Sequence, residues 1–334
     1  MFDNKLPKLL RDYLNYSSNL NKSENTIREY KYDLTNFLKY LKYQEVRLDM
    51  PKNFTIDDIE TISDIDSKFL NQVDINDLYA YMTYLKDVHK DSATTRARKV
   101  ASIRGFFKYL HTKARVIDDN PAKELETPKL GKKLPKFLTL EQSASLLDGV
   151  LNGKLTPKQH DNRVRDYAII TLFLNCGMRL SELVNIDISH IKFDEALMTV
   201  IGKGNKERTV YLNKASIDAI KKYLEIRPTD GVMDEKALFL SERKTRISRR
   251  TVQNLIKNDL RNIVGLTDHY STHKLRHTAA TLMYQYGNVD IRALQEILGH
   301  ESIATTEIYT HVDNSQIREA IENNPLANYH PDNP

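Results

Sequence analysis

Residues 197–212 read LMTVIGKGNKERTVYL and decide how the second half of the chain can fold. Two short runs of β-branched and apolar residues, 197–201 and 208–212, flank the polar stretch 202–206. Two glycines and an asparagine between such runs are typical of a turn that joins paired strands. The stretch therefore predicts a hairpin, or an adjacent strand pair in a small antiparallel sheet.

The sequence around this stretch favours helices. Residues 165–184 have a helical pattern, and residues 248 to about 323 are again mostly helical. We therefore expect the second half to form a mixed α/β domain that is mostly helical, with one small antiparallel sheet.

The first third of the chain is predicted to be helical throughout. Ser23 is a plausible N-cap for the first long helix, and further amphipathic segments cover residues 76–85 and 93–111. The apolar stripe of that first helix comprises Ile27, Tyr30, Leu34, Phe37, Leu38 and Leu41. The whole chain is thus expected to be mainly α with a small antiparallel β-sheet.

A linker is predicted between the two parts. Asn120-Pro121 ends the first part, and residues 127–138 are poor in apolar side chains and contain two prolines, a glycine and several lysines. The expected organisation is a helical N-terminal domain over 1–126, a basic linker over 127–138 and a C-terminal domain over 139–334. No internal repeat or low-complexity tract is apparent.

Composition bounds the class of protein. Of 334 residues, 40% are hydrophobic and 28% are charged, which is ordinary for a globular protein with two domains. No apolar run is long enough to span a membrane, and the N-terminus does not resemble a signal peptide, so we expect a cytoplasmic protein. Cys176 is the only cysteine, which excludes an internal disulfide and a cysteine-rich zinc site.

The net charge of +5 is a mild basic bias that is compatible with DNA binding. The linker is locally basic, whereas residues 49–66 are rich in acidic side chains and would repel a polyanion. The basic side of the helix over 93–111 favours neither a DNA-facing nor a solvated surface on its own. The candidate DNA-binding residues are Arg96, Lys99, Arg104, Lys132 and Lys133.

Three segments carry groups that could do chemistry. In the first, Arg179 and Glu182 are three residues apart, so on a helix they share a face and the carboxylate can orient the guanidinium. Taken alone, this pattern fits an ordinary surface ion pair better than a functional site.

The second segment places His273, Arg276 and His277 on one polar face. A metal site is disfavoured because the glutamate of an HExxH motif is missing and Arg276 adds a positive charge. One arginine and two histidines suit a phosphate better, since arginine contacts phosphate oxygens in pairs and histidine can move a proton near neutral pH.

The third segment, residues 298–311, reads LGHESIATTEIYTH and contains His300 and Tyr309. The chain has 18 tyrosines, and most tyrosines in proteins serve packing or interfaces. Nothing inside this segment distinguishes Tyr309 as a nucleophile.

Together these segments resemble the conserved boxes of the tyrosine recombinase (phage integrase) family, most closely its Xer-like branch. The resemblance rests on GMRLSEL over 177–183, GKGNKER over 202–208, HKLRH over 273–277, and LGH over 298–300 followed by Tyr309. The N-terminal part resembles the family's SAM-like core-binding domain through Asn25-Thr26, Tyr30, Asp33-Leu34 and Phe37. Cys176, where threonine is common, and the long acidic segment 49–66 depart from the pattern.

The resemblance implies cleavage and rejoining of DNA through a 3′-phosphotyrosine and a Holliday junction, with no metal, ATP or other cofactor. Tyr309 would attack phosphorus and His273 would act as its base, while Lys203, with Lys206 as the alternative, would protonate the leaving 5′-oxygen. Glu182 and His277 would have supporting roles. The groups that stabilise the transition state would be Arg179, Arg276 and His300.

The implied partner is a double-stranded recombination site, held between two domains and bound by a tetramer of one or two kinds of subunit. The segment after Asn314 would contact a neighbouring subunit, and a septal DNA translocase is a possible activator. Chromosome-dimer resolution is favoured over mobility of an integrated element, since the chain resembles compact Xer proteins. The rival functions are a type IB topoisomerase and a DNA-binding regulator that has lost catalysis.

Overall fold

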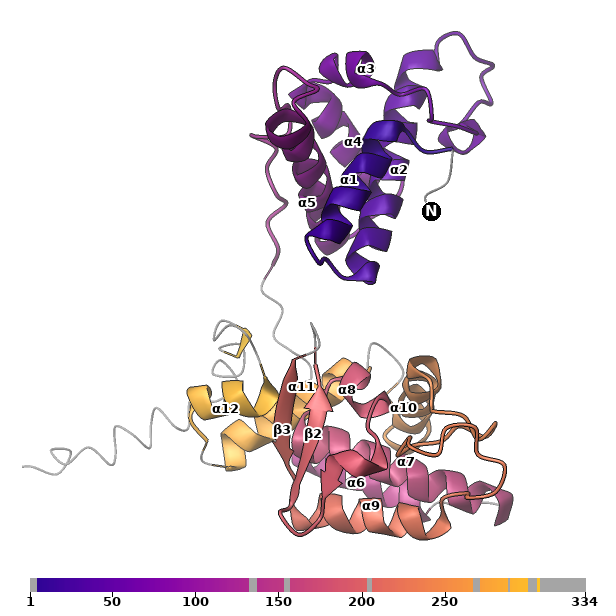
Figure 1. Cartoon of the computed structure of the whole chain (residues 1–334), viewed down its shortest axis with the longest axis vertical. Coiled ribbons are helices and arrows are strands. Elements are labelled where there is room, and N and C mark those ends of the chain that lie inside the picture. The colour runs from indigo at the N-terminus through magenta and orange to yellow at the C-terminus, as the bar shows by residue number, and fades with distance from the viewer. Residues whose placement is uncertain are drawn as a thin grey trace, which may run out of the picture. The chain divides into compact units, whose positions relative to one another are not determined.

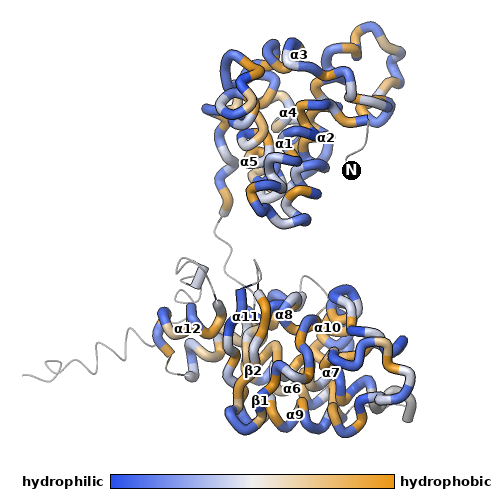
Figure 2. The backbone as a smooth tube through the Cα atoms, in the orientation of Figure 1, coloured by the Kyte–Doolittle hydropathy of each residue, from blue (hydrophilic) through white to orange (hydrophobic). Residues whose placement is uncertain are grey.

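The computed structural model describes residues 5–131, 137–152, 157–202, 206–266, 271–287, 289–299 and 305–306. The chain divides into two compact units, Met1–Lys132 and Lys133–Pro334. Each unit has a hydrophobic core of its own. Apolar and polar residues alternate along most helices of both units, as expected for helices that bury one face (Figure 2).

The described part of the first unit is built from helices (Figure 1). A single turn of 3-10 helix, η1, covers Ile56–Asp58, and α5 ends in a π-helical turn, η2, over Leu110–Ala114. The α-helices are α1 (Lys8–Asn19), α2 (Glu24–Val46), α3 (Ser67–Asn71), α4 (Ile75–Asp87) and α5 (Ala93–Tyr109).

The start of α2 follows from its sequence. The Ser23 hydroxyl accepts a hydrogen bond from the Thr26 backbone N–H at 3.2 Å, which satisfies one of the open donors of the first turn. The later members of the predicted stripe form the helix's buried face, while Ile27 and Tyr30 are only partly buried against the same core. The fully or nearly buried members are Leu34, Phe37, Leu38 and Leu41.

A buried carboxylate joins α2 to α5. Asp33 is 1% exposed and accepts hydrogen bonds from Arg98 Nη1 at 2.5 Å and from the Ser102 hydroxyl at 2.8 Å. Burial raises the pKa of Asp33, although Ser102 and Arg98 act against this rise. Arg98 is therefore held by a buried carboxylate although its own side chain is 39% exposed.

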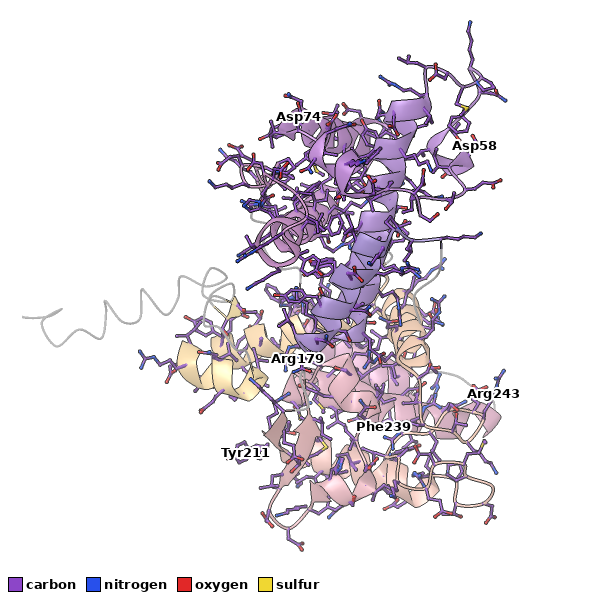
Figure 3. The ribbon with its side chains drawn as sticks, turned by 45° about the horizontal axis from the view of Figure 1, so that its top comes forward. Asp58, Asp74, Arg179, Tyr211, Phe239 and Arg243 are labelled. Atoms are coloured by element: carbon purple, nitrogen blue, oxygen red, sulfur yellow. The ribbon has the colours of Figure 1, made fainter. Side chains whose placement is uncertain are left out.

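The acidic segment 49–66 is folded onto the first unit. Ile59, Ile62 and Ile65 insert their side chains into the core, where each is at most 5% exposed. Asp58, labelled in Figure 3, accepts a hydrogen bond from the Thr55 backbone N–H at 2.7 Å. The spacing of three isoleucines explains how a segment with so many charges stays ordered.

The second unit contains a three-stranded antiparallel sheet in the order β1-β2-β3, of which β2 and β3 are labelled in Figure 1. The strands are β1 (Ile191–Lys192), β2 (Leu197–Ile201) and β3 (Glu207–Tyr211), and Thr199 lies opposite Thr209. The predicted strand pair and the expected fold class, mainly α with a small antiparallel sheet, are confirmed.

Helices make up the remainder of the described part of this unit. The short α8 follows α7 after a turn at Gly177, and α12 packs on α11 (Figure 1). The helices are α6 (Leu140–Asn152), α7 (Pro157–Cys176), α8 (Leu180–Val184), η3 (Ile188–His190), α9 (Lys214–Ile226), α10 (Arg249–Ile263), α11 (Thr272–Tyr286) and α12 (Ile291–Leu298).

The end of the predicted linker lies within the second core. Leu138 is fully buried there, and its backbone N–H donates to the Thr278 hydroxyl of α11 at 2.9 Å. On the N-terminal side of the predicted linker, Leu125 is fully buried in the core of the first unit. None of the described helices combines the length and the apolar character needed to cross a membrane.

Candidate active site

Arg179, which is labelled in Figure 3, and Glu182 form the centre of an ionic cluster in the second unit. Arg179 immediately precedes α8, and its backbone N–H and its Nη1 each donate to the Glu182 carboxylate at 2.8 Å. The Glu182 side chain is fully buried, whereas the Arg179 side chain is 32% exposed. The carboxylate therefore holds one side of the guanidinium and leaves another side accessible.

Arg208 is a second cation on the same carboxylate. It lies on β3 and donates to Glu182 through Nη2 at 2.7 Å and through Nε at 3.2 Å. Burial on its own would raise the pKa of Glu182, but Arg208 and Arg179 outweigh this and the pKa is lowered. The sequence pattern placed Arg208 in a family box without a role, and only the tertiary contact brings it to this site.

Arg276 projects from α11 into the same region. It is 3% exposed and donates from Nη1 to the Gly177 carbonyl and from Nη2 to the Leu298 carbonyl, both at 2.6 Å. Gly177 has a φ of +57°, and a Cβ there would lie 2.8 Å from the Leu298 side chain. A glycine is thus required at the turn that leads from α7 to Arg179.

The carbonyls at the end of α12 bind both Arg179 and Arg276. Arg179 Nη2 donates to the Gly299 carbonyl at 2.5 Å, one residue beyond the carbonyl that Arg276 binds. The last carbonyls of a helix lack partners within it and carry its partial negative charge, so guanidinium groups satisfy both needs. Arg179 and Arg276, predicted from separate segments, are brought together at this turn.

The two predicted histidines lie one turn apart on α11. The rings of His273 and His277 meet edge to face, with centroids 4.3 Å apart, and His273 is the more exposed of the two. Burial, followed by the charge of Arg276, lowers the pKa of His273. Burial and His273 lower the pKa of His277 to about 4. Both rings are therefore neutral near pH 7 and able to accept a proton.

Lys203, His300 and Tyr309 lie outside the described residues. The residues beside two of them are described. Gly202 comes so close to Glu182 that a Cβ on it would lie 3.6 Å from Oε1, and Gly299 contacts Arg179. The chain thus reaches the ionic cluster directly before residue 203 and directly before residue 300.

Among the predicted DNA-binding residues, the prediction for Lys99 is wrong. It is 2% exposed, and its ammonium group pairs with Asp91 at 2.9 Å inside the first unit. Lys99 lies on the buried side of α5, so its ammonium group cannot contact a phosphate unless the side chain leaves the core. Arg104 is exposed and Arg96 is half-buried, while Lys132 and Lys133 lie outside the described residues.

A basic surface that the sequence patterns did not single out lies on α10. Its buried side is apolar, and its one acidic residue, Asp259, is partly buried. The exposed side combines cations with amide side chains, a set that suits phosphates and base edges. It comprises Arg249, Arg250, Gln253, Asn254, Lys257 and Arg261. The two arginines that follow the N-cap Ser248 are the sequence feature that could have indicated this surface.

A mainly apolar pocket of about 560 Å³ is lined by residues of α7, β3, α11 and α12, among them Arg208 of the ionic cluster. Tyr211, labelled in Figure 3 and 77% exposed, stands at this pocket. Cys176 and Met283 line it, and burial raises the pKa of the Cys176 thiol to about 11. That thiol is protonated at neutral pH and is no nucleophile there.

Comparison with known proteins identifies the family. The model of the phage integrase family matches residues 136–316. The tyrosine recombinase XerC of Caldanaerobacter subterraneus is 52% identical over 326 residues, which cover 97% of this chain and 88% of that protein. The tyrosine recombinase XerC of Leptospira interrogans is 30% identical over 316 residues, covering 95% and 91%.

Solved structures show the same fold. The XerH recombinase bound to its palindromic difH substrate matches with a TM-score of 0.68 at 22% identity, covering 89% of this chain and 79% of that one. A lambda integrase dimer bound to a core site matches with a TM-score of 0.64 at 16% identity, covering 89% and 95%. From its sequence boxes, its fold and these relatives, the chain belongs to the phage integrase family of tyrosine recombinases, in its Xer-like branch.

Proposed function

We propose that this recombinase cleaves a DNA strand by attack of Tyr309 on a phosphodiester, which leaves a 3′-phosphotyrosine and a free 5′-hydroxyl. The observation that carries the proposal is the convergence of Arg179 and Arg276, from distant segments, on consecutive carbonyls at the end of α12. Two guanidinium groups fixed at one place suit a phosphate, because they concentrate positive charge and N–H donors there.

The reaction gathers negative charge on the non-bridging oxygens of phosphorus, which Arg179 and Arg276 stabilise together with a hydrogen bond from His300. A tyrosine has a pKa of about 10 and needs a base, and His273 can serve because its lowered pKa keeps it neutral. Lys203 protonates the leaving 5′-oxygen, with Lys206 as the alternative. Rejoining reverses these steps without ATP, since the phosphotyrosine bond stores the energy.

The DNA partner is a double-stranded recombination site. The exposed cations on α10, Arg104 on α5 and the linker lysines Lys132 and Lys133 contact the phosphate backbone, so binding weakens steeply with added salt. The two domains, residues 1–126 and 139–334, close on the duplex, and the basic linker that joins them crosses the DNA backbone. The acidic segment 49–66 lies away from the phosphate backbone of the DNA, because the negative charges of the two repel each other.

The active assembly is a tetramer on two sites, of one or two kinds of subunit, that passes through a Holliday junction. The segment after Asn314 contacts a neighbouring subunit, and the apolar pocket beside Tyr211 supports this role by offering an acceptor surface. The protein acts in the cytoplasm on chromosome dimers or on a mobile element, and a septal translocase is a possible activator.

The test begins with a duplex recovered from a random-sequence pool by binding to the Tyr309→Phe protein. A nick near the scissile phosphate of that duplex lets a short strand escape, so that cleavage traps the covalent complex. A slower band on a denaturing gel that is lost in Tyr309→Phe supports the proposal. Tight binding without an adduct supports the inactive regulator instead, and plasmid relaxation without strand exchange supports the topoisomerase.

A further inference from the structure

Arg208 connects three elements of the second unit. Its side chain leaves β3, binds both carboxylate oxygens of Glu182 on α8, and donates from Nη1 to the Ile297 carbonyl on α12 at 2.8 Å. It is only 15% exposed. Such a two-point bond to a carboxylate fixes the orientation of both groups.

Three consecutive carbonyls at the end of α12 accept hydrogen bonds from three different arginines. Ile297 is bound by Arg208, Leu298 by Arg276 and Gly299 by Arg179. Because each arginine comes from another segment, the position of this turn depends on all of them at once. The chain runs on directly from this turn to residue 300.

Arg208 also determines the charge available at the site. Glu182 is buried and carries one negative charge, which Arg179 alone would neutralise in a closed pair. With Arg208 as a second cation, the group of three retains one positive charge. A phosphate that approaches the exposed side of Arg179 therefore meets a net positive field.

We propose that Arg208 is a positioning residue for strand cleavage, which balances Glu182 so that the charge of Arg179 acts on the scissile phosphate and which holds the turn before His300. This inference rests on the proposed function. Arg208 acts through Glu182 and Ile297, which its guanidinium binds, and we assign it no contact with DNA. Its removal should slow the chemical step and leave DNA affinity nearly unchanged.

The test compares Arg208→Gln and Arg208→Lys with the wild-type full-length chain. Single-turnover formation of the covalent adduct is measured on the nicked duplex at saturating protein, and affinity is measured separately on the intact duplex. In metal sites, the outer groups that orient a ligand contribute roughly 10- to 100-fold to activity, and we expect Arg208→Gln to slow cleavage by a similar factor. Affinity should change less than about 3-fold, and lysine should restore part of the rate.

A matched control is Arg246→Gln. Arg246 also bridges two carboxylates, Asp187 at 2.6 Å and Asp234 at 2.8 Å, but it stands outside the ionic cluster. Thermal unfolding of each variant shows whether it is folded at the assay temperature. Arg246→Gln should lower the unfolding temperature and leave the cleavage rate near wild type, which separates a loss of stability from a loss of positioning.

A double variant tests the charge balance between Glu182 and the two arginines. In Arg208→Gln the Glu182 carboxylate neutralises Arg179, so adding Glu182→Gln should release that charge and make the double variant faster than Arg208→Gln alone. A double variant slower than Arg208→Gln contradicts charge balance. A folded Arg208→Gln that cleaves at the wild-type rate, or one that loses affinity and rate together, overturns this inference alone. A wild-type protein that forms no adduct overturns the proposed function and this inference with it.

Discussion

Replacing Gly299 by alanine should damage the site at the turn that all three arginines hold. Gly299 has a φ of +63°, and an added Cβ would lie 2.8 Å from Arg208 Cδ and 3.5 Å from Arg179 Nη1. A left-handed backbone is costly for a residue with a Cβ, and the contact with Arg208 is closer than packed carbons allow. The guanidinium of Arg208 must therefore shift.

A control isolates the two contributions. Gly265 has a φ of +71°, and among the described residues no atom lies within 4 Å of a Cβ built on it. Gly265→Ala should therefore cost only the backbone term, about 1–2 kcal/mol. Gly299→Ala also weakens one charged hydrogen bond of Arg208, which costs about 1.5–3 kcal/mol more, so its total cost is roughly 2.5–5 kcal/mol.

Urea unfolding gives the two free energies, and single-turnover cleavage of the nicked duplex gives the rates. We expect both variants to be destabilised and only Gly299→Ala to be slow, at a temperature where each is folded. Equal loss of cleavage in Gly265→Ala would mean that backbone strain alone lowers activity. A wild-type rate in Gly299→Ala would refute the claim that this turn positions the arginines.

Three further outcomes follow from the structure. Folding lowers the pKa of His277 from 6.5 to about 4, whereas burial raises the pKa of Asp166 to about 6 and of Asp259 to about 7, which acts in the opposite direction. The contribution of His277 is therefore the difference between two proteins, and wild type should lose stability relative to His277→Asn in urea titrations as the pH drops from about 6.5 toward 4. Lys99→Gln should cost about 1.5–3 kcal/mol of stability by removing the charged hydrogen bond to the partly buried Asp91, which keeps His89 as a partner, yet leave the salt dependence of DNA binding unchanged. Arg250→Gln on α10 should instead weaken binding and reduce the slope of log affinity against log salt by about 1 in fluorescence anisotropy, with the adduct rate unchanged at saturating DNA.

Periodicity and capping predicted the local structure well. The strand pair around residues 202–206 and the N-cap at Ser23 follow from turn chemistry and from short-range hydrogen bonds, which the sequence encodes directly. The ion pair between Arg179 and Glu182 was predictable for the same reason, since the partners are three residues apart.

Contacts between distant segments could not be read in this way. Lys99 and Arg104 stand on one helix with similar charge, and only the packing of α5 against the rest of the unit decides that Lys99 is buried on Asp91. Arg208 and Glu182 are 26 residues apart, and no periodic pattern relates them. The role of a cation depends on which carboxylate the fold brings to it.

The central claim is that Tyr309 becomes joined to DNA, and the peptide that contains it can be identified directly. Trypsin should release residues 293–318 as one peptide, which contains no internal lysine or arginine and a single tyrosine, Tyr309. After cleavage of the nicked duplex and nuclease digestion, mass spectrometry should find this peptide carrying a nucleotide on Tyr309. A nucleotide on any other residue, or adduct formation that persists in Tyr309→Phe, would contradict the account.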